Sequence, residues 1–320
     1  MRPEPPRRAT GSHACGDGRM DVAVTGSTGL IGSALCTALE ARGDRVVRIL
    51  RRDPSGRGEI HWDPADGALD PSDLRGTDAV VHLAGAGIAD RRWTSAQRDR
   101  IRESRTRGTT LLASALAEIR DDGGPSTLVS GSAIGVYGDA GDHLLDENGP
   151  RGTGFLADVC IAWERATERA GNAGIRVAHA RTGVVLSPEG GLLAKQLPLF
   201  RLGLGGRLGS GHQYLSWISL RDEVAALLWL VDREVEGPVN LVAPSPVTNA
   251  EFARSLGSTL GRPARLPVPA AIPTVMFGRD LVSELMLAST RVRPRVLEDG
   301  GFAFTDPELG PALRAMVAGR

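Results

Sequence analysis

The stretch Thr25-Gly26-Ser27-Thr28-Gly29-Leu30-Ile31-Gly32 decides the fold of this chain. It follows a short apolar run, Asp21–Thr25, of the kind that forms a buried parallel strand. After it, apolar residues recur at helical spacing as far as Leu39, and Gly43 predicts the end of that helix. A second apolar run, Arg45–Leu50, predicts the next strand. The order strand, glycine turn, helix, strand within about thirty residues predicts a βαβ unit.

The glycine turn predicts a dinucleotide-binding site. Gly26 allows a tight turn out of the strand, Gly29 lets backbone N–H groups approach a pyrophosphate, and Gly32 lets the helix pack close to the sheet. The helix N-terminus adds unpaired N–H donors and the positive end of its dipole. The position between a strand and an amphipathic helix favours this site over an ordinary tight turn. The predicted cofactor-binding residues here are Thr25, Gly26, Ser27, Thr28, Gly29, Leu30, Ile31 and Gly32.

The end of the second strand predicts which cofactor binds. Arg51 and Arg52 follow the strand, and two guanidinium groups suit the 2′-phosphate of NADP(H). NAD-binding proteins usually place an acid there, and Asp53 comes next, so NAD(H) stays as the alternative. Asp63 lies in the stretch His61-Trp62-Asp63-Pro64 and is predicted to contact the adenine side, or else to form a simple turn.

Further apolar runs alternate with helical patterns. Strands are predicted at Ala79–Leu83, Thr127–Ser130 and Arg176–Ala180, with helices at Ser95–Ile119 and Phe155–Arg169 between them. This alternation predicts the α/β class: a Rossmann fold with a doubly wound parallel sheet.

The chain is predicted to divide into three parts. Residues 1–19 are interpreted as a disordered tail or as a start codon assigned too early, and residues 20–189 as an NAD(P)-binding Rossmann domain. Residues 190–320 are richer in Gly and Pro and are predicted to form a smaller C-terminal substrate lobe. Within it, residues of about 221–243 are predicted to return to the Rossmann core as a helix, Arg221–Val231, and a strand, Val239–Val242.

Two strand ends add candidate site residues. Small residues after a strand let a cofactor pass close to the backbone, so Leu83, Ala84 and Gly85 are predicted to bind it, whereas His82 is interpreted as a core histidine. Ser130 and Gly131 lie at the end of another strand and are predicted to bind the cofactor as well.

Composition limits the function classes. Basic and acidic residues number 38 each and aromatic residues make up 4%, which disfavours binding to nucleic acid or to an acidic membrane. Three distant cysteines argue against a disulfide framework and favour a cytoplasmic location. No apolar run reaches membrane-spanning length, and the six histidines show no metal-ligand spacing, so no metal is predicted. Lys195 is the single lysine, so any lysine-dependent chemistry must use it.

Several segments together resemble the extended short-chain dehydrogenase/reductase superfamily, of the sugar-nucleotide epimerase type. More closely, they are similar to its atypical "epimerase family" group, which carries a C-terminal segment of unknown role, here about Pro267 to Leu313. The resemblance implies a Rossmann fold, an NAD(P) cofactor and an oxidoreductase or epimerase activity; some members are labelled cell-division inhibitors. The segments that carry it are Ser130–Gly138, Gly154–Cys160 with Trp163-Glu164, Arg181–Leu186 and Gly209–Ile218.

The sequence departs from the superfamily at its catalytic residues. The superfamily transfers hydride with a Ser and a Tyr-x-x-x-Lys pair, whose lysine lowers the pKa of the tyrosine and binds the nicotinamide ribose. Aligning Glu164 with the glutamate that follows this lysine puts Leu156 at the tyrosine position and Cys160 at the lysine position. Leucine cannot transfer a proton, so the resemblance implies cofactor binding without the standard proton relay.

Two other residues are candidates for catalysis. Ser132 is predicted either to donate a hydrogen bond to a substrate carbonyl or to cap the backbone at a strand end. Tyr137 offers a phenol, but without a lysine its pKa would stay near 10, which suits proton transfer poorly at neutral pH.

The glycine-rich loop near residue 212 supplies the substrate-pocket candidates His212, Gln213 and Trp217, with a solvated loop as the alternative. The sequence thus predicts an NADP(H)-dependent oxidoreductase or epimerase acting on a small molecule, as a monomer or homodimer. The alternative is a regulatory protein that senses NADPH without turnover, which the missing dyad favours. A purely structural scaffold is disfavoured by the intact phosphate-binding turn.

Overall fold

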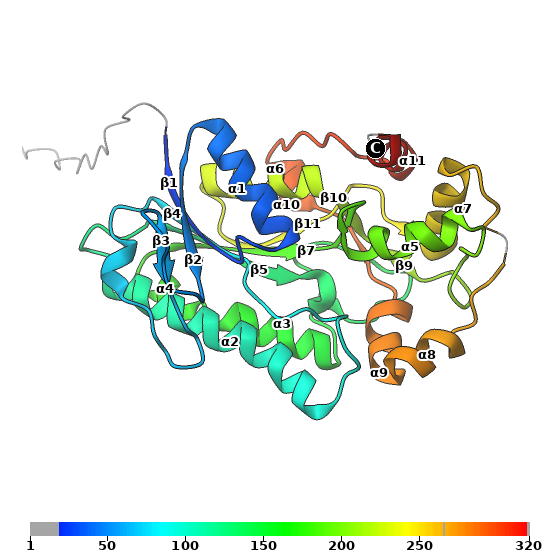
Figure 1. Ribbon diagram of the computed structural model, residues 1–320, viewed down its shortest axis with the longest axis horizontal. Helices are drawn as coiled ribbons and strands as arrows, with labels where there is room; N and C mark the ends of the chain where they lie inside the picture. The colour runs from blue at the N-terminus through cyan, green and yellow to red at the C-terminus, as the bar shows by residue number, and fades with distance from the viewer. Residues whose placement is uncertain (1–18, 265, 319–320) are drawn as a thin grey trace, which may run out of the picture.

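A seven-stranded, all-parallel sheet forms the centre of the computed structural model, which describes residues 19–264 and 266–318 (Figure 1). The predicted N-terminal tail lies outside these residues, except for Arg19. The strands of the sheet are β1 (Asp21–Thr25), β2 (Arg45–Leu50), β3 (Glu59–His61), β4 (Ala79–His82), β5 (Thr127–Ala133), β7 (Arg176–Thr182) and β11 (Gly237–Leu241). Their order is β11-β7-β5-β4-β1-β2-β3. The predicted doubly wound Rossmann sheet is confirmed.

Strand β1 lies at the point where the strand order reverses. It pairs with β2 on one side and with β4 on the other, Thr25 standing opposite Ile49 and His82. In open parallel sheets of this kind, ligands bind at the carboxyl ends of the strands on either side of the reversal. The fold therefore directs attention to the ends of β1 and β4.

Helices cover both faces of the sheet (Figure 1). One face carries α1 (Leu30–Arg42) and α6 (Leu220–Asp232), and the other carries α2 (Ser95–Glu118), α3 (Phe155–Arg165) and α4 (Glu168–Asn172). Alternate residues of β1 serve the two layers: Val22 and Val24 join the core under α1 and α6, and Ala23 joins the core under α2. The single helix predicted at Phe155–Arg169 is two helices, because α3 ends at Arg165 and α4 begins at Glu168.

A smaller group of elements lies beyond one end of the sheet (Figure 1). Its core packs Trp217, Phe252 and Leu313 together. The remaining helices are α5 (Gly191–Arg201), α7 (Asn249–Thr259), α8 (Ala271–Phe277), α9 (Arg279–Leu281), α10 (Arg295–Asp299), α11 (Leu309–Ala318), 3₁₀ turns at Pro71–Leu74 and Ile134–Tyr137, and a π-helical turn at Val282–Leu287. The short strands are β6 (Leu144–Leu145), β8 (Val184–Ser187), β9 (Tyr214–Leu215), β10 (Trp217–Ser219), β12 (Val247–Thr248) and β13 (Arg291–Val292).

No helix within residues 19–264 and 266–318 is both long enough and apolar enough to cross a membrane.

The first turn of α6 buries two acidic side chains. Asp222 accepts hydrogen bonds from the backbone N–H groups of Thr305 and Asp306, which ties the segment before α11 to the start of α6. Glu223 is fully buried, and only one of its carboxyl oxygens is bonded, to the Thr182 hydroxyl. Burial raises the pKa of Glu223 to about 8, so this side chain is protonated in the folded protein at neutral pH.

The protonated Glu223 predicts a pH-dependent stability. Between its ordinary pKa of 4.5 and about 8, the folded protein holds a proton that the unfolded chain releases, so stability falls as the pH rises. Glu223→Gln keeps the shape without titrating, so we expect its stability to fall less steeply than that of the wild type from about pH 5 to about pH 8. Urea unfolding across this range measures both slopes. Equal slopes would contradict the assignment.

Candidate functional site

The glycine turn between β1 and α1 packs too closely for any side chain at two of its positions. Gly26 has a φ of +69°, and a Cβ there would lie 2.9 Å from the carbonyl carbon of Leu83. A Cβ on Gly32 would lie 2.2 Å from the Gly26 carbonyl oxygen. Both glycines are therefore required for the close approach of the turn, the loop after β4 and the start of α1.

The same turn offers unused hydrogen-bond donors. Helix α1 begins at Leu30 with Gly29 as its N-cap, and no side chain caps it, so the N–H groups of its first turn have no intrahelical acceptor. Thr28 and Gly29 are exposed. Ser27 is buried, and its hydroxyl has no hydrogen-bond partner among the described residues. Open N–H donors and an unpaired buried hydroxyl at a helix N-terminus fit the phosphates of a dinucleotide.

The side chains of Leu30 and Ile31 contribute packing. Leu30 lies against Gly190, where an added Cβ would be 3.1 Å from Leu30 Cδ2. Ile31 packs onto the core beneath α1 and α6. These two residues can therefore serve a ligand through their backbone N–H groups, while their side chains fix the position of the helix end.

A buried hydrogen-bonded chain supports the end of β4. Thr25 Oγ1 accepts the backbone N–H groups of Leu83 and Ala84, at 3.1 and 3.2 Å, and lies 2.7 Å from His82 Nδ1. The other ring nitrogen of His82 lies 2.9 Å from Thr109 Oγ1. Burial lowers the pKa of His82 to about 4, so the ring is neutral. His82 is the core histidine that the sequence predicts, and the fully buried Thr25 holds the loop after β4 in place.

The two arginines after β2 have different surroundings. Arg52 donates two hydrogen bonds to Glu59, at 2.6 and 2.9 Å, and Arg52 and Ser55 together lower the pKa of Glu59 to about 2. Arg51 is exposed and forms no ion pair within the described part of the chain. Arg51 is therefore the guanidinium that is free for a phosphate.

Asp63 forms a turn. Its Oδ1 accepts the backbone N–H of Ala65 at 2.8 Å, and its own backbone pairs with Ala68 in both directions. The structure thus supports the turn interpretation of this residue, and nothing in its bonding calls for a role at the adenine.

Ser130 and Gly131 lie inside β5. Ser130 is fully buried, and its hydroxyl donates to the carbonyl of Gly131. A Cβ on Gly131 would lie 2.9 Å from the ring of Trp163, so the glycine makes room for a tryptophan. The prediction that these two residues contact the cofactor is corrected, because packing closes both of them off.

The two predicted catalytic residues belong to a buried polar network. The Ser132 hydroxyl donates to Glu164 at 2.9 Å, and Arg181 binds the two oxygens of Glu164 at 2.7 and 3.0 Å. Arg181 also donates to the Tyr137 hydroxyl at 2.9 Å, and that hydroxyl donates to Asn240 at 2.8 Å. Burial would raise the pKa of Glu164, but Arg181 holds it below its ordinary value.

This network corrects the catalytic predictions for Ser132 and Tyr137. Both are buried, and each hydroxyl already donates to an acceptor in the network. Burial also raises the pKa of Tyr137, the opposite of what proton transfer at neutral pH requires. The bonding assigns both residues a structural role.

A buried arginine stands near the residue at the lysine position. Cys160 is buried, and burial raises its pKa to about 12, so it is an unreactive thiol. Arg105 of α2 lies 5.0 Å above the ring of Trp163 and donates to the carbonyls of Ala86 and Ile101. The sequence analysis did not single out Arg105.

A signal for Arg105 existed in the sequence. Arg105 falls four residues after Ile101 and seven before Leu112, both fully buried, so it lies on the apolar stripe of an otherwise arginine-rich helix. A cation on the core-facing side of a helix differs from its solvated neighbours, and such a residue needs a partner.

The structure separates the three predicted substrate-pocket residues. His212 and Gln213 line a pocket, together with Asp139, Gly141, Asp142, Gly209, Ser210, Ala270, Leu287 and Ser289. Trp217 is fully buried in the core of the smaller lobe, and its indole N–H donates to the carbonyl of Ser245. The prediction that Trp217 faces a substrate is corrected, because Trp217 is the first residue of β10 and is fully buried.

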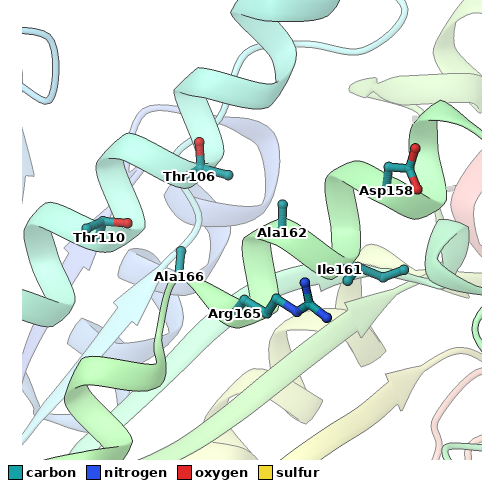
Figure 2. Close-up of a pocket in the computed structure, with 7 residues that line it drawn as sticks. All are labelled: Thr106, Thr110, Asp158, Ile161, Ala162, Arg165 and Ala166. Carbon is teal, nitrogen blue, oxygen red and sulfur yellow. The ribbon is translucent and has the colours of Figure 1, made fainter.

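Another pocket lies between α2 and α3 (Figure 2). It contains none of the predicted site residues. Its lining residues are Thr106, Thr110, Asp158, Ile161, Ala162, Arg165 and Ala166.

Comparison with known proteins identifies the family. Residues 22–242 match the model of the NAD dependent epimerase/dehydratase family, and residues 268–316 match a domain of unknown function, DUF1731. The chain is 48% identical over 293 residues to epimerase family protein Mb2239 of Mycobacterium bovis, covering 91% of this chain and 96% of that one. It is 38% identical over 303 residues to epimerase family protein SDR39U1 of Homo sapiens, covering 93% and 100%.

A solved structure is similar over the same length. The crystal structure of human epimerase family protein SDR39U1 (isoform 2) with NADPH aligns with a TM-score of 0.87 and 36% identity, covering 94% of this chain and 100% of that one. The resemblance drawn from the sequence motifs is thus confirmed. The chain belongs to the NAD dependent epimerase/dehydratase family, with a DUF1731 segment at its C-terminal end.

Proposed function

We propose that this protein binds NADP(H) at the carboxyl ends of β1 and β4 and acts as an oxidoreductase or epimerase on a small molecule. The observation that carries the proposal is the buried, unpartnered Ser27 hydroxyl beside the open N–H groups at the start of α1. The NADPH bound by human SDR39U1 supports the choice of cofactor.

Each part of the turn has a role in this proposal. Ser27 and the first backbone N–H groups of α1 hold the pyrophosphate, while Gly26 and Gly32 allow the backbone to come close. Arg51 binds the 2′-phosphate through its free guanidinium. When bound, the nicotinamide supplies or accepts a hydride.

Arg51 predicts the preference for NADP(H). Arg51→Ala removes the free guanidinium, and we expect it to weaken NADPH binding at least tenfold more than NADH binding. Arg52→Ala is the matched comparison: because Glu59 already holds Arg52, we expect a smaller selective loss. Calorimetric titration of both nucleotides into each variant measures the difference. Equal losses for NADPH and NADH in Arg51→Ala would refute the assignment.

A second candidate function is a regulatory one, in which the protein senses NADPH without turnover. The engagement of Ser132 and Tyr137 in the network of Glu164 and Arg181 favours it, because neither hydroxyl is free to relay a proton. Turnover would then require the proton to come from water or from the substrate itself.

Turnover and sensing are separated by following the absorbance of reduced nicotinamide while the pure protein is incubated with NADPH and a panel of aldehydes, ketones and keto-sugars. Oxidation of NADPH with any of them supports the enzyme. Tight NADPH binding with no oxidation across the panel supports the sensor. A cytoplasmic location, a small-molecule partner and a monomeric or homodimeric state remain predictions.

A further inference from the structure

Arg105 is a buried cation without a carboxylate partner. Arg105 is only 7% exposed, and it forms no ion pair within residues 19–264 and 266–318. One terminal nitrogen, Nη1, donates to the carbonyls of Ala86 and Ile101 at 3.0 and 3.1 Å. Nε and Nη2 have no acceptor among the described residues. The guanidinium is largely buried, but Nε and Nη2 are not among the fully buried polar atoms that lack a partner, so these two donors are open to solvent or to a ligand.

The guanidinium lies against the loop that follows β4 and packs on the glycine turn. Leu83 and Ala84 contact Gly26, and the next residue, Gly85, is exposed. A Cβ added to Gly85 would lie 3.3 Å from Arg105 Cζ, so a residue larger than glycine would press against the guanidinium. The loop from Leu83 to Gly85 therefore lies against the glycine turn at one end and against Arg105 at the other.

Arg105 also lies near the position in α3 where the superfamily has its catalytic lysine and this chain has Cys160. Cys160 takes the lysine position when Glu164 is aligned with the glutamate of the family motif. The charge of Arg105 lowers the pKa of the Cys160 thiol, whereas burial raises it. Trp163, one turn further along α3, lies under the guanidinium at 5.0 Å. A positive charge is thus present beside Cys160, and it is carried by α2 and not by α3.

We propose that Arg105 is a cofactor-binding residue: it supplies the fixed positive charge at the nicotinamide end of the cleft, where Cys160 replaces the lysine. Its free Nε and Nη2 donors bind the nicotinamide half of the cofactor, while Ala86 and Ile101 hold the guanidinium in place. This inference rests on the proposed NADP(H) binding.

A truncated cofactor tests the assignment. NADPH and adenosine 2′,5′-bisphosphate, which lacks the whole nicotinamide half, are titrated calorimetrically into wild type and Arg105→Gln. We expect the variant to bind NADPH about tenfold more weakly, since charge-assisted hydrogen bonds are lost, and to bind the fragment within about twofold of wild type. Equal losses for both ligands, or no loss for either, would overturn the proposal. Arg107→Gln is the control, because Arg107 lies on the same helix, is exposed and pairs with Glu103.

The wild-type protein provides a second test that needs no variant. The oxidised nicotinamide ring carries a positive charge and the reduced ring carries none, so a fixed guanidinium beside it disfavours NADP⁺. We expect NADPH to bind at least about fivefold more tightly than NADP⁺. Equal affinities, or tighter binding of NADP⁺, would contradict the placement of Arg105. Failure of the wild type to bind either nucleotide would instead refute the proposed function itself.

Discussion

Gly32→Ala is expected to abolish measurable NADPH binding and to destabilise the fold. The added Cβ would lie 2.2 Å from the Gly26 carbonyl oxygen and 3.0 Å from Ser27 Cα, so α1 must move away from the turn. Alanine improves helix propensity by about 1 kcal/mol over glycine, but the steric penalty of overpacking is typically about 1–3 kcal/mol or more, and here the neighbour is backbone that cannot rotate away. Displacing the turn also disperses the donors that would hold the pyrophosphate, so we expect at least a hundredfold loss of affinity.

Calorimetry with NADPH and thermal unfolding test this substitution. Gly171→Ala is the matched control, because Gly171 lies in α4 and an added Cβ would meet only Val177 Cγ2, at 3.9 Å. We expect the control to bind NADPH as the wild type does and to be equally stable or more stable. Wild-type affinity in Gly32→Ala would show that this turn does not hold the cofactor.

Arg181→Met is expected to destabilise the folded protein by about 3–5 kcal/mol, the usual result of removing one partner of a buried ion pair. Glu164 would then keep only the Ser132 hydroxyl and the half-exposed Arg151, at 3.8 Å, and Tyr137 would lose one of its two hydrogen-bond partners. Urea unfolding near neutral pH measures the loss.

The control for Arg181→Met is an exposed pair. Arg75→Met removes the surface contact with Asp122, at 3.5 Å, and we expect a change of about 0–1 kcal/mol. The pH adds a second check. Arg181 holds the pKa of Glu164 below its ordinary 4.5, so the stabilisation by the pair is present above that pH and is lost as the pH falls through the lowered pKa. The cost of Arg181→Met should therefore shrink in acid, and a cost independent of pH would argue that lost packing dominates.

The parts of the fold that local sequence determines were predictable. Between Asp21 and Leu50, the strand, the turn and the helix are each determined by neighbouring residues. Strands β1 and β2 have the predicted bounds, and α1 ends directly before Gly43. Gly26 and Gly32 predict that the turn packs closely against neighbouring backbone, because a side chain at either position would not fit. The close packing of the glycine turn could thus be predicted without a structure.

The misassigned residues depend on contacts far along the chain. Tyr137 is bonded to Asn240, 103 residues away, and Trp217 to Ser245, 28 residues away, so a motif in one segment could not show that either side chain is buried. Arg105 lies in α2 and contacts Gly85, in the loop after β4, and Trp163, in α3. Such residues are recognised only when the sheet brings their partners together.

The bonding of His82 has a consequence for how the site responds to acid and base. The Thr109 hydroxyl donates its proton to the carbonyl of Arg105, at 2.7 Å, so it can only accept from His82, which must carry its hydrogen on Nε2. The Nδ1 tautomer is therefore ruled out, and the Thr25 hydroxyl must donate to that nitrogen. Each group in this chain of hydrogen bonds donates to the next one, from the backbone N–H groups of Leu83 and Ala84 to the carbonyl of Arg105 in α2. Reversing it would mean rotating two hydroxyls and losing the bond to the carbonyl, so the imidazole is held in one tautomer and, with its pKa lowered to about 4, does not itself titrate near neutral pH.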